Sequence, residues 1–227
     1  MYYKLHGATK DYIWGGNRLA AYGYPGDRIA EAWVLSLHPD GMASIDGRPA
    51  NEVLTRADWG KNCDRFAMFP VLVKLIDAKS DLSVQVHPSD AYALANEGQY
   101  GKTEMWYVVD AEPGAGLYIG CKKAMTKSEF AERIAAGTLT DALHFAAVKP
   151  GDCYFIPSGT IHAIGKGCLI AEVQQNSNLT YRVYDYGRLG ADGKPRALHI
   201  DQAIAVADLS VYEPPVFTDA LAECEYF

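Results

Sequence analysis

Two segments of this chain, far apart in the sequence, carry side chains of the kinds that bind divalent metal ions. The first segment holds Gln85, His87 and Glu104, and the second, at 151–162, ends in His162. Imidazole nitrogens, carboxylates and amide oxygens are donors that zinc and similar ions accept. Three strong ligands and a weaker amide also leave room for water or a substrate, as a catalytic metal site requires. The chain therefore has such a site only if its fold brings the two segments together.

The segment at 82–87 is typical of a β-strand because apolar and polar residues alternate along it. This period of two places Ser83, Gln85 and His87 on one face, so the two candidate ligands point the same way. Further strands are predicted at 71–76, 104–109, 153–156 and 169–173, with glycine and proline in the turns. Short strands separated by such turns favour a mainly β fold, a sandwich or jelly roll.

Helices are expected to interrupt the strands, chiefly near 90–97 and 126–146. Ser89 or Asp90 can cap the first of them, and residues 126–129 form a capping box for a helix that ends at Gly137. Other short helical segments are expected at 140–145, at 200–209 and, weakly, within 51–69.

Composition and charge exclude several classes of protein. Of the 227 residues, 49% are hydrophobic and 22% charged, which is typical of a globular protein with a sizeable core. A net charge of −7 does not favour nucleic acid, and the apolar run at 69–76 is far too short to span a membrane. The five cysteines include no C-x-x-C pair, which predicts reduced thiols rather than a cysteine-held zinc. We expect a cytoplasmic monomer or homodimer with neither nucleic-acid nor membrane partners.

The two segments resemble the halves of the cupin signature, an H-x-H…E half and a G-x5-P-x-G-x2-H half. Gln85 stands where the general pattern has histidine, and this departure points to one family. The chain resembles the type I mannose-6-phosphate isomerases, zinc-dependent cupins, most closely in their short bacterial form. The matching stretches run through most of the chain, at 13–16, 30–33, 69–74, 81–88, 101–107, 148–167, 172–177 and 180–188.

The resemblance implies a cupin jelly roll with helical insertions over residues 1–210. Relatives usually continue into a second cupin-like domain, and residues 211–227 resemble its start. The resemblance also implies one Zn²⁺ per chain, although the same donors accept other divalent ions. The implied zinc ligands are Gln85, His87, Glu104 and His162.

The activity implied by the resemblance is the reversible interconversion of mannose 6-phosphate and fructose 6-phosphate, with Arg182 as a catalytic residue and Lys102 lining the site. Such an isomerase moves a proton between C1 and C2 through an enediolate. We hypothesise that Lys102 and Glu172 share the proton handling. Arg182 can bind the substrate phosphate or stabilise the enediolate. Ser83 shares the face of Gln85 and is a further candidate for the phosphate, with sheet packing as the alternative.

Two other classes of function remain open. Another metal-dependent cupin enzyme, such as an iron oxygenase, prefers histidine at the position of Gln85 and gains nothing from Lys102 or Arg182. A non-catalytic cupin that binds sugar phosphates would keep the ligands without turnover. Asn178, where the family commonly has a carboxylate, keeps this class open. Metal identity distinguishes the first alternative, and turnover distinguishes the second.

Overall fold

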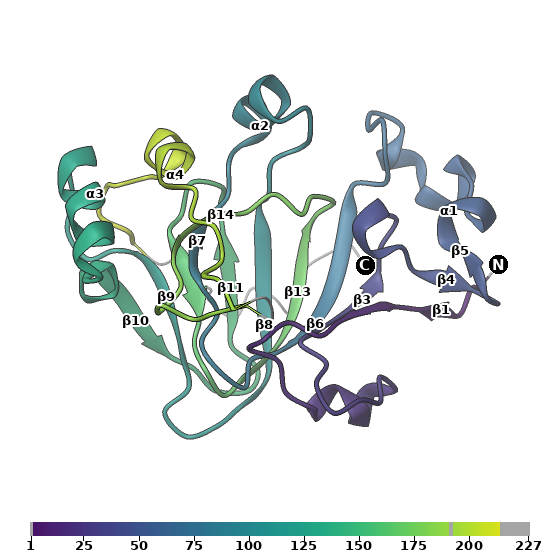
Figure 1. Ribbon diagram of the computed structural model, residues 1–227. Helices are drawn as coiled ribbons and strands as arrows, with labels where there is room; N and C mark the ends of the chain where they lie inside the picture. The colour runs from purple at the N-terminus through teal and green to yellow at the C-terminus, as the bar shows by residue number, and fades with distance from the viewer. Residues whose placement is uncertain (1, 191–192, 214–227) are drawn as a thin grey trace.

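Two antiparallel sheets form the body of the protein (Figure 1). The computed structural model describes residues 2–190 and 193–213. The six-stranded sheet has the order β11 (Cys153–Ile156), β8 (Glu104–Ala111), β13 (Cys168–Gln175), β6 (Val71–Asp77), β3 (Glu31–Leu35) and β2 (Ala8–Lys10). The five-stranded sheet has the order β10 (Leu143–Ala147), β9 (Gly116–Cys121), β12 (His162–Ile164), β7 (Val84–Val86) and β14 (Tyr181–Tyr184). A third, small sheet near the N-terminus consists of β1 (Leu5–His6), β4 (Ser44–Ile45) and β5 (Arg48–Pro49).

The main hydrophobic core lies between the two large sheets. It contains Trp106 and Ile170 from the six-stranded sheet together with Leu117, Ile119 and Ile164 from the five-stranded sheet. Alternation along each strand sends one set of side chains into this space and the other set outward. Residues on the inward face of both sheets therefore reach a common interior, where a site can form.

A second core covers the outer face of the five-stranded sheet. Val84 and Val86 of β7 pack there with Phe130 and Ile134 of α3 (Lys127–Ala136) and with Ala203 of α4 (Ile200–Val206). Both helices lie at the left of Figure 1. Because Val84 and Val86 point to the helices, Ser83 and Gln85 point between the sheets, as the alternation predicted.

The remaining helical segments are short. They are α1 (Ala50–Val53), α2 (Asp90–Asn96) and the 3₁₀ turns η1 (Arg18–Tyr22), η2 (Pro39–Gly41), η3 (Arg56–Trp59), η4 (Lys61–Cys63) and η5 (Leu139–Ala142). Ser89 caps α2 by accepting a hydrogen bond from the Tyr92 amide. None of the helices in the described part of the chain has the length and hydropathy needed to cross a membrane.

The structure confirms the mainly β prediction, with the difference that the described strands do not close into a barrel. The helix expected at 140–145 is wrong, because only η5 forms there and residues 143–147 form strand β10. Hydrogen bonds to β9 satisfy the backbone groups of β10. A helix of only six residues forms few internal hydrogen bonds and is marginally stable. Helix α4 also ends before residue 209, since the Asp208 amide donates to the Gly159 carbonyl instead of continuing the helix.

The predicted domain limits stay a prediction. Most of the segment proposed as the start of a second domain, residues 214–227, lies outside the described residues. Cys63, Cys121, Cys153 and Cys168 are free thiols, as expected, and Cys224 also lies outside the described residues.

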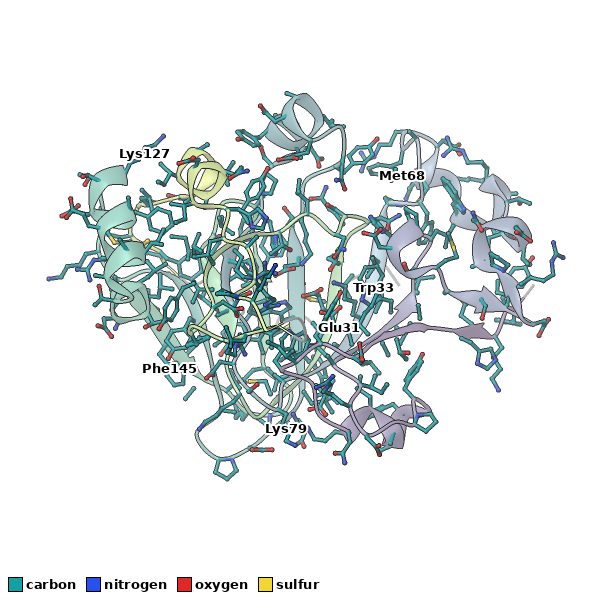
Figure 2. The ribbon with its side chains drawn as sticks, in the orientation of Figure 1. Glu31, Trp33, Met68, Lys79, Lys127 and Phe145 are labelled. Atoms are coloured by element: carbon teal, nitrogen blue, oxygen red, sulfur yellow. The ribbon has the colours of Figure 1, made fainter. Side chains whose placement is uncertain are left out.

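Helix α3 offers a test of local stability away from the interior. Thr126 and Glu129 form the predicted capping box, and Gly137 ends the helix with a left-handed conformation at φ 68°. We predict that Thr126→Ala lowers the free energy of unfolding by about 1 kcal/mol, because it leaves an N-terminal amide without its acceptor. Urea denaturation measures the change. Lys127→Ala, on an exposed residue of the same turn (Figure 2), is the control and should change stability by less than about 0.5 kcal/mol. Equal effects of both substitutions would contradict the capping role.

Candidate active site

The chain after β7 is held tightly against the start of β8. The Lys102 amide donates to the Pro88 carbonyl at 3.1 Å, and the Gly101 amide donates to Asp90 Oδ1 at 2.8 Å. A Cβ at Gly101 would come within 2.4 Å of the Pro88 oxygen, so only glycine allows this approach. The contact brings His87 next to Lys102 and to the first residue of β8.

The turn at 157–160 connects the second segment to the same place. The Thr160 amide donates to the Pro157 carbonyl at 3.1 Å, and Gly159 has φ 88°, a conformation that favours glycine. The Gly159 amide donates to the His87 carbonyl at 2.7 Å. The turn thus connects the two halves of the sequence motif through this hydrogen bond, and His162 follows as the first residue of β12.

His87, Glu104 and His162 form a buried cluster whose ligand atoms lie within 4.8 Å of one another. Each histidine uses Nδ1 to donate to a backbone carbonyl, that of Leu179 at 2.9 Å and that of Thr160 at 2.8 Å. These bonds leave Nε2 of both rings without a proton when the rings are neutral. This is the usual arrangement of histidines that bind metals.

The charge state of the cluster also fits a metal. Burial, and then the charge of Lys102, lower the pKa of His162 to about 4, and the same two causes hold the pKa of His87 well below its usual value. Burial, and then the charge of Glu172, raise the pKa of Glu104 to about 7. His162 Nε2 and Glu104 Oε1 lie 3.2 Å apart, both buried and both without a hydrogen-bond partner. Two facing acceptors need a cation or a proton between them, so these residues fit a divalent ion.

Gln85 lies in the same row of the five-stranded sheet as two other predicted residues. It is directly opposite His162 of β12 on one side and Arg182 of β14 on the other. Side chains directly opposite in antiparallel strands have Cβ atoms about 5 Å apart. The sheet register therefore sets the amide of Gln85 between an imidazole and a guanidinium.

A pocket of about 240 Å³ opens between the two sheets beside this cluster. It is large enough for a small ligand rather than a single water. Every predicted residue outside the His87–Glu104–His162 cluster lines it, since the lining consists of Tyr12, Trp14, Glu31, Lys74, Ile76, Leu82, Ser83, Gln85, Lys102, Ile164, Glu172, Asn178, Thr180, Arg182 and Arg196.

Lys102 connects the pocket to the His87–Glu104–His162 cluster. Its Nζ donates to Glu104, lies 3.2 Å from His87 Nε2 and lies 3.7 Å from Glu172 Oε1. Burial acts to raise the pKa of Glu172, but the charges of Lys102 and Lys74 outweigh it and lower this pKa to about 2. Glu172 is therefore a carboxylate at neutral pH.

The pocket lining also contains two arginines, Arg182 and Arg196. Arg182 donates from Nε to Ser83 Oγ at 3.2 Å, and burial followed by the charge of Arg196 lowers its pKa. Arg196 is held by two bonds to Asp185, at 2.6 and 2.7 Å, and Arg188 donates to the same carboxylate. A hydroxyl and two neighbouring guanidinium groups form a site suited to an anion such as phosphate.

Sequence reasoning missed Glu31, Lys74 and Arg196 as pocket residues. The signal for Lys74 was present, because the alternation along β6 puts it on the same buried face as Leu72 and Ile76. A lysine at such a position is rarely buried without a partner. Arg196 precedes α4 in a segment without periodicity, and only the tertiary structure places it.

The comparisons with known proteins agree with this geometry. The family model of the phosphomannose isomerase type I catalytic domain matches residues 2–113. A mannose-6-phosphate isomerase of Streptococcus mutans is 44% identical over 216 residues, which are 92% of this chain and 67% of the relative. The crystal structure of the mannose 6-phosphate isomerase from Bacillus subtilis superposes with a TM-score of 0.86 at 38% identity, over 94% of this chain and 70% of that one.

A more distant solved structure shares the fold alone. It is a mannose 6-phosphate isomerase bound with zinc and yttrium, 18% identical, with a TM-score of 0.67 over 92% of this chain and 75% of that one.

Facing antiparallel sheets with a buried His–Glu–His cluster between them define a protein of the cupin fold. The sequence likeness is more specific than the fold. The chain belongs to the type I mannose-6-phosphate isomerases, a family of enzymes.

Substitutions of the candidate ligands test whether the cluster binds a metal ion. We predict that His87→Ala and His162→Ala each weaken zinc binding by more than about 100-fold, because each removes a strong donor. Loss of a group that only hydrogen-bonds to a metal ligand typically costs about 10- to 100-fold. Gln85→Ala should have a smaller effect, since an amide is a weaker ligand. Competition with a coloured chelator measures the affinity. His144→Ala, on a histidine outside the cluster, is the control, and a loss as large as that of His162→Ala would contradict the assignment.

Proposed function

We propose that this chain interconverts mannose 6-phosphate and fructose 6-phosphate with one bound Zn²⁺. The observation that carries the proposal is a pocket that is lined by Arg182 and Arg196 and also by Lys102, which contacts the buried His87–Glu104–His162 cluster. A sugar phosphate needs both kinds of group, because its carbonyl carbon and its phosphate lie at opposite ends of the molecule. The names of the relatives support the same reaction.

His87, Glu104 and His162 would hold the zinc, with Gln85 as a fourth ligand from the neighbouring strand. Bound there, the ion would supply positive charge beside the oxygens of C1 and C2, where negative charge develops in the enediolate. The relative described with zinc supports this choice of metal, although the donor set also suits other divalent ions.

Arg182 and Ser83 would bind the phosphate. Arg182 is positively charged and already donates to the Ser83 hydroxyl, so both groups converge on one point of the pocket. Charge-assisted bonds from a guanidinium are strong and directional, which orients the sugar chain toward the metal-ligand cluster.

Lys102, an ammonium group beside two carboxylates, would act as the general acid that protonates the oxygen of C1 and recovers a proton from the oxygen of C2. The reaction moves one hydrogen from C2 to C1 and one from O2 to O1, so atoms balance without a further reactant. A general base works best when its pKa is near the working pH. Because the pKa of Glu172 is lowered to about 2, this carboxylate is a poor base. We therefore assign Glu172 to holding Lys102, from 3.7 Å, rather than to taking the proton itself.

Turnover and its metal dependence test the proposed function directly. Conversion of mannose 6-phosphate would be measured on the purified chain, after chelation, and after zinc is added back. We expect activity that chelation removes and zinc restores. A folded chain with bound zinc that binds mannose 6-phosphate but does not convert it would overturn the proposal in favour of a binding protein.

The proton-handling assignment makes a separate prediction. Lys102→Met should lower kcat by about 10²- to 10⁴-fold, the usual contribution of a general acid or base, while zinc content stays close to one per chain. Glu172→Gln should lower kcat less and also keep the metal. Metal analysis of the same samples provides the check, and equal loss of zinc and turnover in either variant would contradict the assignment.

The phosphate assignment predicts a different kinetic change. Arg182→Met should lower kcat/KM by about 10- to 100-fold, the value of one lost hydrogen bond to a charged group, mainly through a higher KM. Inhibition by inorganic phosphate should weaken in parallel. Arg48→Met, on an exposed residue of β5, is the matched control. An unchanged inhibition constant for phosphate in Arg182→Met would exclude this residue from the phosphate site.

A further inference from the structure

Lys74 is a buried lysine in the middle of β6 that lines the pocket and has no role in the proposed chemistry. We propose that Lys74 is a positioning residue for the reaction, which holds the Glu172 carboxylate in the orientation that binds Lys102. The inference rests on the proposed function and deepens it. It concerns a residue that acts through its neighbour and not on the substrate.

The register of the six-stranded sheet places Lys74 beside Glu172. Glu172 of β13 lies opposite Lys74 of β6 on one side and opposite Trp106 of β8 on the other. Lys74 Nζ is 3.2 Å from Glu172 Oε1, and Trp106 Nε1 donates to Glu172 Oε2 at 2.9 Å. Both carboxylate oxygens are thus held from opposite strands. Lys102 shares Oε1 with Lys74, at 3.7 Å.

Lys74 keeps its charge despite full burial. Burial alone would lower its pKa, but the carboxylates of Glu31 and Glu172 outweigh this and raise the pKa above the usual value. The buried charged groups form a chain of contacts in which each group lies next to one of opposite sign. We call this arrangement the charged row, and it consists of Glu31, Lys74, Glu172, Lys102 and Glu104.

The far end of the charged row is fixed to the core. Trp33 Nε1 donates to Glu31 Oε2 at 2.6 Å, and the same oxygen lies 3.7 Å from Lys74 Nζ. The Lys74 ammonium also lies 4.8 Å from the centre of the Trp33 ring, within cation–π distance. Figure 2 labels Glu31 and Trp33, which lie near each other on β3. With Glu31 and Trp33 fixing it, Lys74 cannot follow Glu172 if the carboxylate turns away.

A double-mutant cycle tests whether Lys74 acts through Glu172. Lys74→Met should lower kcat by roughly 10- to 100-fold, as loss of an outer-shell partner does, with KM changed by less than about 3-fold. In the Glu172→Gln background the same substitution should cost less than about 3-fold, because the group it positions is already changed. Lys74→Arg should recover part of the lost kcat. Independent losses that multiply, or a change confined to KM, would overturn the proposal in favour of direct substrate contact.

Asp77→Asn is the matched control for loss of a buried charge on the same strand. Asp77 pairs with Arg18 at 2.7 Å and does not line the pocket. It should lower stability while kcat stays near that of the unchanged chain. A drop in kcat as large as that of Lys74→Met would show that any buried charge lost from β6 has this effect, and would overturn the proposal.

A second measurement does not depend on turnover, so failure of the proposed function would be recognised separately. The indole N–H resonance of Trp106 in a ¹⁵N spectrum reports its bond to Glu172, and Trp106→Phe identifies the signal. We expect Lys74→Met to move this resonance as Glu172→Gln does, and Lys74→Arg and Asp77→Asn to leave it near its original position. An unmoved resonance in Lys74→Met would contradict the positioning role even in a chain without isomerase activity. The spectrum needs no active enzyme, so it can be recorded for a variant that loses activity too quickly for kinetic measurements.

Discussion

The site depends on how β7 pairs with its two neighbours. Gln85 lies opposite His162 and Arg182, so this one strand sets the distance between the His87–Glu104–His162 cluster and the arginine in the pocket lining. Side chains alternate along a strand, and a slip of one residue would turn Gln85 toward the helices and Val84 into the pocket. Packing of Val84 and Val86 against the α3 and α4 core therefore fixes the register, and a hydrophobic contact on one face determines the chemistry on the other.

The second constraint is the cost of removing charge from water. Lysines and carboxylates between two sheets are unfavourable unless each has a partner of opposite sign. The charged row meets this condition by alternation, and it explains why two neighbouring carboxyl groups differ so much. Glu172, between two ammonium groups, has a pKa lowered to about 2, whereas burial and the charge of Glu172 raise that of Glu104 to about 7. This difference in pKa makes Glu172 a fixed structural charge and Glu104 a group suited to a metal ion.

Much of this site was readable from sequence because its parts have local signals. The alternation at 82–87 gave the face of Gln85, and the turn at 157–160 with its glycine marked the approach to His162. The contacts within the charged row had no local signal, although the burial of Lys74 did, since the members of the row come from β3, β6, β13 and the start of β8 and meet only through sheet register. The helix prediction for residues 140–145 was wrong for the same reason. Pairing of this segment with β9 is a tertiary contact, and local propensity carries no information about it.

The alternating row also limits how the sequence can change over evolution. A neutral residue at the position of Lys74 would leave Glu31 and Glu172 as two buried carboxylates with one fewer ammonium group between them, and a neutral Glu172 would leave two lysines facing each other. Each single step away from the present set passes through a destabilised intermediate. Positions 31, 74 and 172 should therefore vary together among relatives or remain fixed together, so that they are inherited as one unit rather than as separate sites.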